Sequence, residues 1–458
     1  MKYNIFKISL ILIIIFFQFS CKKIIQIDVP KDSVVQETIF QNNDAATSVM
    51  TGIYRSMSNN GFASGNNMSI TSSAGLTADE FSSHSTLLKE FYDNELNPLT
   101  TNISSLYASP YETIYATNVL LEGLEGQNNI TLPNRTQLRG EALFIRAFAY
   151  FYLVNMFGSV PLHITSDYRV TRIASRTTVT EIYKQIISDL KTAENLLKDT
   201  YITTERIRPN LSTVQALLAR TYLYTQDWEN AEKYATLVIN KTSIYNLVNV
   251  DAIFLKNSQE AIWQLMPTTA SGNTNEGTLL ILTGTPTNLS LNSDFALNSF
   301  EANDERKNSW IRSYTNATGT YYYPFKYKAR TASPVTEYYM VMRLAEQFLI
   351  RAEARVQQKD ISGAIDDIDK IRNRAGITLI KNTNPNISAN DLSILIQKER
   401  RVELFSEWGH RWFDLKRSGN ATAVLSLVKP MWQATDVFYP IPQREIDLNS
   451  NITQNVGY

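Results

Sequence analysis

Apolar residues recur every three or four positions over much of the chain, which is the spacing of helices that pack one face against a core. Such segments run over residues 40–57, 105–124, 138–157 and 179–197. The segment 138–157 is apolar on nearly every face, so it predicts a helix buried on most sides. The pattern therefore predicts a mainly α-helical protein.

Two further pairs of helices, within 212–239 and 348–371, share one arrangement of small residues. Corresponding positions in the two pairs are taken by the alanines Ala219, Ala231, Ala352 and Ala364. Small side chains at these positions let two helices approach closely, as in a tetratricopeptide hairpin. We therefore expect tetratricopeptide-like helical hairpins that form an α-solenoid body.

Two stretches lack a sustained helical period, and both are rich in turn-forming residues. Residues 58–100 predict a long polar loop with aromatic rings. Residues 241–335 predict an irregular, loop-rich lobe with short strands. Long polar loops that carry rings are frequent places for binding sites.

The segment 397–417 combines aromatic rings with both signs of charge in one predicted helix and turn. Glu399 lies on the apolar stripe of this helix, so an arginine from elsewhere in the chain is expected to bind its carboxylate. Gly409 is expected to end the helix. Glu399, Glu403 and Glu407 recur every four residues among arginines, which favours structural ion pairs over acid/base catalysis.

The N-terminus has the pattern of a bacterial lipoprotein. Residues 1–20 combine a positive start with an apolar run of about ten residues, which suits a signal peptide and is too short to span a bilayer. Cys21 follows, and we expect it to be lipidated, although Gln18 stands where an aliphatic residue is usual. Residues 21–36 would then be a lipid-tethered linker to a single domain, 37–458.

The composition narrows the possible partners. Lys and Arg together number 44, as do Asp and Glu, so no net field favours nucleic acid and no nucleic-acid partner is expected. With only one cysteine, the chain has no disulfide framework. The three histidines have no metal-ligand spacing and there is no glycine-rich nucleotide motif, so neither a metal nor a cofactor is expected.

Several of these features together resemble the SusD/RagB family. They are Cys21, the repeated hairpins, and the segments 140–162, 397–419 and 438–458. The resemblance covers essentially the whole mature chain and implies a helical, lipid-anchored, surface-exposed protein of the Bacteroidetes outer membrane. It also implies a nutrient-binding protein, not an enzyme, that serves a SusC-like TonB-dependent transporter.

The family resemblance implies a glycan ligand or, as in the RagB branch, a peptide. It also implies that binding surfaces form from the early loops and the irregular lobe, here 58–100 and about 270–335. A sugar needs flat rings to stack on and amides or carboxylates beside them. The residues in these regions that satisfy this need, and our candidate ligand contacts, are Tyr92, Asn94, Trp310, Tyr314 and Tyr321.

Structural roles compete with these assignments, because a run of tyrosines also suits a strand with one buried face, and Trp310 suits a core. For the whole protein, the leading interpretation is capture of an oligomeric nutrient, most simply a glycan, for delivery to a transporter. The alternatives are peptide uptake, a hydrolase that acts through carboxylates such as Asp79 and Glu80, and a purely structural repeat scaffold.

Overall fold

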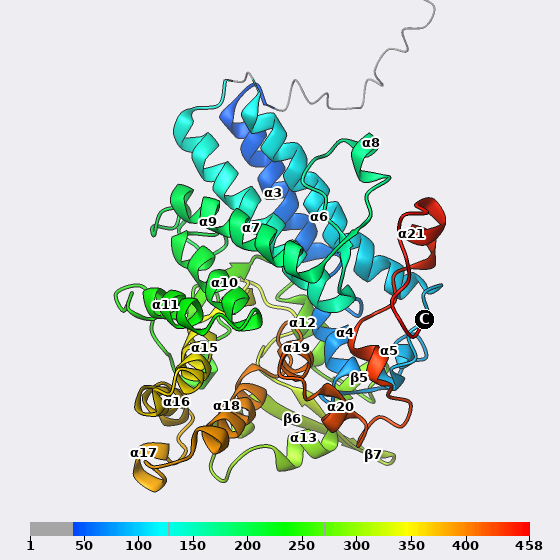
Figure 1. Cartoon of the computed structure of the whole chain (residues 1–458). Helices are drawn as coiled ribbons and strands as arrows, with labels where there is room; N and C mark the ends of the chain where they lie inside the picture. Colours follow the sequence, from blue (N-terminus) through cyan, green and yellow to red (C-terminus); the bar gives the residue numbers. More distant parts are fainter. Residues whose placement is uncertain (1–39, 127–128, 270–271) are drawn as a thin grey trace, which may run out of the picture.

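Helices make up most of the chain (Figure 1), as the apolar pattern predicts. The computed structural model describes residues 40–126, 129–269 and 272–458. Cys21, the expected signal peptide and the linker lie outside the described residues. Within those described ranges, no helix is both long enough and apolar enough to cross a membrane.

Four long helices form the upper part of the molecule as drawn in Figure 1. They are α3 (Asn43–Asn59), α6 (Thr101–Glu125), α7 (Leu132–Phe157) and α9 (Val179–Leu196). α3 begins where the Asn42 side chain accepts a hydrogen bond from the backbone N–H of Ala45 at 2.8 Å, which caps the helix. α7 packs against α6 and α9, so nearly all of its second half is buried. All four predicted helices are confirmed. The connection from α7 to α9 contains β2 (Val160–Pro161), α8 (Tyr168–Thr171) and β3 (Arg176–Thr177).

Two helical hairpins follow the same plan. The first consists of α10 (Leu211–Tyr224) and α11 (Trp228–Ile239), and the second of α15 (Leu344–Gln357) and α16 (Ile361–Arg374). In each, an aspartate caps the second helix: Asp227 accepts from the N–H of Asn230 at 3.2 Å, and Asp360 from that of Gly363 at 3.0 Å. The four matching alanines are fully buried, and α11 packs against α15. The tetratricopeptide-like architecture is therefore confirmed.

The C-terminal part continues from the second hairpin with shorter helices. They are α17 (Ile380–Thr383), α18 (Ala389–Leu404), α19 (His410–Arg417), α20 (Ala421–Leu425), η3 (Ala434–Val437) and α21 (Gln443–Leu448). Of these, α17 and α18 pack against the second hairpin. The predicted role of Gly409 is wrong, because α18 ends at Leu404 and Gly409 instead precedes α19 as its N-cap. Its φ of 69° is left-handed, and a Cβ there would lie 2.6 Å from the Cβ of Ala74. Glycine is thus required by close packing at the start of a helix.

The predicted long loop over 58–100 is also wrong in part. It contains α4 (Ile70–Thr77), β1 (Phe81–Ser83) and α5 (Lys89–Asp93). α4 is buried throughout even though half of its residues are serine or threonine. Each of these hydroxyls has a hydrogen-bond partner: Thr77 donates to the Ser73 carbonyl at 2.9 Å, Ser73 and Ser72 donate to carbonyls just before the helix, and the Thr71 hydroxyl lies 3.1 Å from that of Tyr339. These bonds offset the cost of burying the hydroxyls.

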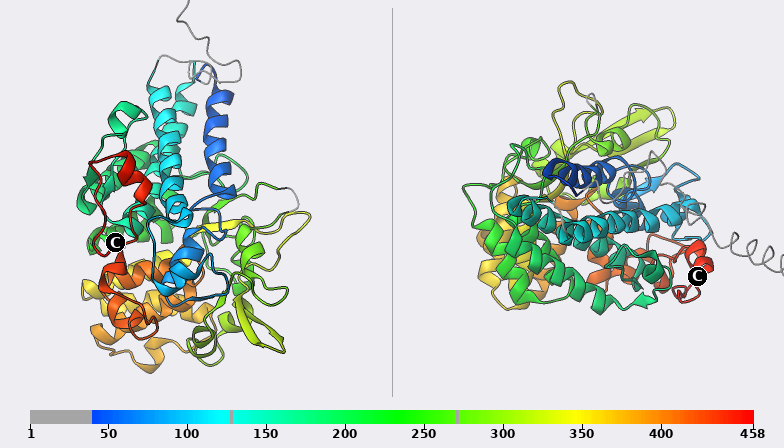
Figure 2. Two further views of the ribbon diagram at one scale, coloured as in Figure 1. Left: turned by 90° about the vertical axis from the view of Figure 1, so that its right-hand side faces the viewer. Right: turned by 90° about the horizontal axis from the view of Figure 1, so that it is seen from above.

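The lobe expected over 241–335 is a mixture of short helices and strands. Its elements are η2 (Val250–Ala252), β4 (Ala261–Leu265), α12 (Asn275–Leu280), β5 (Leu289–Leu291), α13 (Ser293–Asn298), α14 (Glu305–Trp310), β6 (Ile311–Asn316) and β7 (Gly319–Pro324). β4 pairs with the following strand β8 (Tyr339–Arg343). A four-stranded sheet has the antiparallel order β1-β5-β7-β6 and lies to one side of the helical body (Figure 2).

Candidate ligand-binding site

The four-stranded sheet joins the two regions in which a ligand surface is expected. β1, from the early segment, pairs with β5 of the lobe, with Phe81 opposite Leu291 and Ser83 opposite Leu289. β5 pairs in turn with β7, and β7 with β6. Segments about 200 residues apart in the sequence therefore share one surface.

Strand alternation divides the tyrosines of this sheet between its two faces. Tyr322 lies opposite Leu291, on the face that packs against the core. Tyr321 and Tyr323 therefore point to the other face, together with Tyr314, which lies directly opposite Tyr321 on β6. All three are partly exposed. We call Tyr314, Tyr321 and Tyr323 the tyrosine face.

Polar groups border the tyrosine face. The imidazole of His84 meets the Tyr321 ring edge to face at 5.5 Å, and its Nε2 lies 2.8 Å from the Ser290 hydroxyl. Partial burial lowers the pKa of His84, so its ring is neutral near pH 7. The Thr318 hydroxyl lies 3.0 Å from that of Tyr321. Exposed Arg312 pairs across the strands with Tyr323 and stacks over the Phe325 ring at 5.0 Å.

This arrangement has the chemistry that recognises a sugar. Ring faces can pack against C–H groups, and hydroxyl, imidazole and guanidinium groups can exchange hydrogen bonds with hydroxyls at the edge of the ligand. Two of the five predicted contacts, Tyr314 and Tyr321, are brought together here. His84, Tyr323 and Arg312 were missed. The alternation of Tyr321 and Tyr323 along one strand predicts that they share a face, whereas no sequence feature near His84 predicts its contact with Tyr321.

The other three predicted contacts lie elsewhere. Tyr92 is on α5, next to the β1 edge of the sheet and far in strand order from β6. Its ring is half buried, and the Lys429 ammonium sits 3.9 Å from the ring centre. Lys429 also donates to the Tyr92 carbonyl at 2.6 Å, so this ring already has a cationic partner within the protein.

Trp310 and Asn94, which were also predicted to contact the ligand, both have buried side chains. Trp310 is 0% exposed, and its indole N–H donates to the Val250 carbonyl at 3.0 Å. Asn94 is 4% exposed and ends α5 in a left-handed conformation, from which it donates to the Thr77 carbonyl at 3.2 Å. Neither side chain is presented to a ligand in this structure. Trp310 is a core ring, and Asn94 is a turn residue that tolerates positive φ.

The carboxylates considered for hydrolysis are held in different ways. Both oxygens of Asp79 accept hydrogen bonds from Arg411, at 2.7 and 2.9 Å, and one also from Arg401 at 2.8 Å. Burial alone would raise the pKa of Asp79, but these arginines lower it below its usual value. Burial and the Asp79 charge raise the pKa of Glu80 to about 8. Glu80 is only 1% exposed, and its oxygen accepts from the Ser406 N–H at 3.3 Å.

The glutamates of α18 and the loop after it form a buried ionic network, as the sequence predicts. Glu399 binds Arg306 at 2.5 Å and Arg372 at 3.1 Å. Glu403 binds Arg306 and Arg343, and Glu407 binds Arg343. The expected arginine partner of Glu399 thus exists and comes from α14. These carboxylates tie the lobe to the helical body.

Two family models match the chain. One, described as "Starch-binding associating with outer membrane", matches residues 27–223, and the other, described as "SusD family", matches residues 271–458. The chain belongs to the SusD/RagB family. SusD-like protein P25 of Formosa agariphila is 24% identical to it, over 97% of this chain and 98% of the relative.

Solved SusD-like structures share the fold. A structure described as a laminarin binding SusD-like protein matches with a TM-score of 0.76 and 23% sequence identity. The match covers 92% of this chain and 100% of the chain in that structure. The surface glycan-binding protein A from Bacteroides fluxus has a TM-score of 0.74 and 19% identity, with coverages of 91% and 99%. At such identities the likeness establishes the shared SusD architecture.

Proposed function

We propose that this SusD/RagB protein binds a glycan on the tyrosine face. The observation that carries the proposal is the cross-strand pairing of two partly exposed tyrosines, beside a histidine, on a sheet built from both regions implied by the family resemblance. A family described as starch-binding supports a glycan over a peptide. Two SusD-like neighbours with glycan-binding titles agree with it.

We further propose that the protein delivers this glycan to a SusC-like TonB-dependent transporter and does not hydrolyse it. The family description, which places such proteins with the outer membrane, supports the location, and membership of the SusD/RagB family supports the transporter partner. Lipid attachment at Cys21 would provide the anchor. One apolar core that includes residues from Phe40 to Ile452 supports a single domain over 37–458.

The test compares a double variant, Tyr314→Ala with Tyr321→Ala, with the wild type by calorimetry on the oligosaccharide that a glycan array selects. The matched control is Tyr168→Ala, which removes a tyrosine that is 70% exposed on α8, outside the sheet. Loss of two stacking rings should weaken binding at least tenfold, while the control binds like the wild type and all three keep the same helical circular dichroism.

Equal affinity of the double variant and the wild type would refute the tyrosine face as the site. A protein that binds peptides and no glycan would refute the ligand class and favour uptake of peptides. Release of new reducing ends from the bound oligosaccharide would contradict the claim that the protein only binds it.

A further inference from the structure

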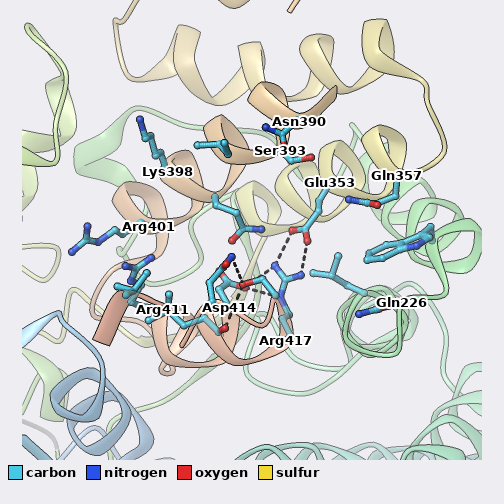
Figure 3. Close-up of a pocket in the computed structure, with 18 residues that line it drawn as sticks. Gln226, Glu353, Gln357, Asn390, Ser393, Lys398, Arg401, Arg411, Asp414 and Arg417 are labelled. Carbon is cyan, nitrogen blue, oxygen red and sulfur yellow. Dashed lines mark hydrogen bonds and ion pairs between the residues drawn. The ribbon is translucent and has the colours of Figure 1, made fainter. Parts of the chain in front are cut away.

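A large cavity lies among the helices, away from the tyrosine face (Figure 3). Its volume is about 730 Å³. It is walled by the turn between α10 and α11, the end of α15, one side of α18, and the helices α19 and α20. We call it the α18 cavity. None of its lining residues belongs to the early segment or the lobe, so it is separate from the surface described above.

α18 presents a polar face to this cavity. The polar residues on that face follow the helical spacing of three, four and seven. They are Asn390, Ser393, Gln397, Lys398 and Arg401. The other side of α18 is buried through Leu392, Ile396 and Glu399. Exposed helix faces of this composition are often only solvated. The hydrogen-bond partners of these side chains therefore decide whether the face is free to bind a ligand.

Four amide side chains line the cavity. They are Gln226, Gln357, Asn390 and Gln397, and none makes a side-chain hydrogen bond with a residue that the structure describes. Three of the four are labelled in Figure 3, on separate walls. Each amide offers donors and an acceptor, so the set can pair with groups that also do both, which sugar hydroxyls do.

Positive charge exceeds negative charge around the cavity. The charged lining residues are Lys398, Arg401, Arg411, Arg417, Glu353 and Asp414. Arg401 and Arg411 share a single carboxylate, Asp79, while Arg417 bridges Glu353 and Asp414 at the cavity floor (Figure 3). Asp414 is also bound by buried Arg400. Within the lining itself, four cations stand against two carboxylates.

The unbalanced charge is accessible. Lys398 is exposed and has no ion-pair partner among the described residues, and the Arg401 side chain is 23% exposed. The two are three residues apart on α18, so they lie on the same face. A carboxylate or sulfate group could therefore reach both. Half-buried Trp228, on the wall formed by the start of α11, and the exposed side chain of Ile394 on α18 add apolar surface to the cavity.

We propose that the α18 cavity binds a short anionic oligosaccharide, with a uronate or sulfate group near Lys398 and Arg401 and its hydroxyls on the four amides. The walls are helices, whose backbone groups are already paired, and they offer no strand edge along which an extended peptide could add. The many amides suit a ligand rich in hydroxyls. This proposal does not depend on the tyrosine face.

The test is calorimetry on the full-length protein at 50 mM and 500 mM NaCl. The probes are tetragalacturonate and a sulfated tetrasaccharide, with maltotetraose as the neutral sugar, tetraglutamate as the acidic peptide and sodium sulfate as the simple anion. The variant is Lys398→Ala with Gln397→Ala. Its matched control is Lys370→Ala, which removes an exposed lysine on α16 that does not line the cavity.

At least one anionic tetrasaccharide should bind the wild type at least tenfold more tightly than maltotetraose does, and more weakly at the higher salt concentration. The double variant should lose at least tenfold in this affinity, while Lys370→Ala keeps it. Retained binding in the double variant would overturn the site. Binding of neither anionic sugar, or tighter binding of sulfate alone or of tetraglutamate, would overturn the ligand class.

Discussion

Replacing Glu403 by glutamine tests the idea that the buried network holds the lobe on the helical body. Glu403 is 0% exposed, and Arg343 and Arg306 contact its two oxygens at 2.5 and 2.9 Å. Arg374 also binds it. Glu403→Gln keeps the shape and removes the charge that neutralises these guanidinium groups.

The expected loss of stability depends on the charged groups that remain buried in the variant. Removing one partner of a buried ion pair typically costs about 3–5 kcal/mol, because the other charge remains buried. Arg343 keeps Glu260 at 2.9 Å and Glu407 at 2.8 Å, and Arg306 keeps Glu399. These remaining partners place the expected loss at the lower end, about 3 kcal/mol.

The pH dependence gives a second, independent outcome. Burial alone would raise the pKa of Glu403, but the charges of Arg374, Arg343 and Arg306 hold it well below its ordinary value of 4.5. A lowered pKa in the folded state gives stability that is present above pH 4.5 and lost as the pH falls through the folded-state pKa. The gap between wild type and variant should therefore be widest near pH 7 and shrink in acid.

Urea denaturation at pH 7 and in acid measures both effects. The matched control is Glu125→Gln, because Glu125 is 62% exposed and pairs with Arg139 at the surface at 2.7 Å, so its loss should cost less than about 1 kcal/mol. If Glu403→Gln costs no more than this control, or if the gap widens in acid, the network does not carry the stability assigned to it.

Three further predictions concern the hairpins, a buried carboxyl and the anchor. Ala219→Leu should overpack the first hairpin and cost about 1–3 kcal/mol in urea denaturation, while Ala423→Leu, at an exposed position on α20, should cost nothing measurable. Because the pKa of Glu80 is raised from 4.5 to about 8, its burial destabilises the fold increasingly as pH rises above 4.5, so Glu80→Gln should be more stable than wild type by at least about 1 kcal/mol at pH 8 but not at pH 4. If thermal melts show the same difference in melting temperature between Glu80→Gln and the wild type at pH 4 and at pH 8, this prediction is contradicted. Cys21→Ala should move the protein from the detergent phase to the aqueous phase in a partition assay without changing its circular dichroism, and a variant that stays with the detergent would exclude a lipid on Cys21.

The helical body could be predicted because its signals are local. The apolar spacing over 138–157 and the matched alanines such as Ala219 and Ala352 depend only on helix geometry. The need of Glu399 for a cation was also predictable, since a carboxylate on an apolar stripe must be neutralised. That the cation is Arg306 could not be read from the sequence, because chain folding alone brings α14 to α18.

The errors share one physical cause, which is that burial is decided by tertiary packing. The sequence of α4 is polar, yet the helix is buried because its hydroxyls find hydrogen-bond partners in the helix, in the residues just before it and in Tyr339. Trp310 follows turn-rich sequence, yet it is buried in the core against Phe405 and Phe254. For the same reason His84 was not linked to Tyr321, because the pairing of β1 with β5 joins segments that are distant in sequence.

The most direct test of the central claim is a crystal structure of the protein with the oligosaccharide that a glycan array selects. The account predicts electron density for a sugar ring stacked on Tyr314 or Tyr321, with hydroxyls within hydrogen-bond distance of neighbouring polar groups such as His84. A structure in which the selected oligosaccharide is bound elsewhere and the tyrosine face is empty, or an array on which no glycan binds, would contradict it.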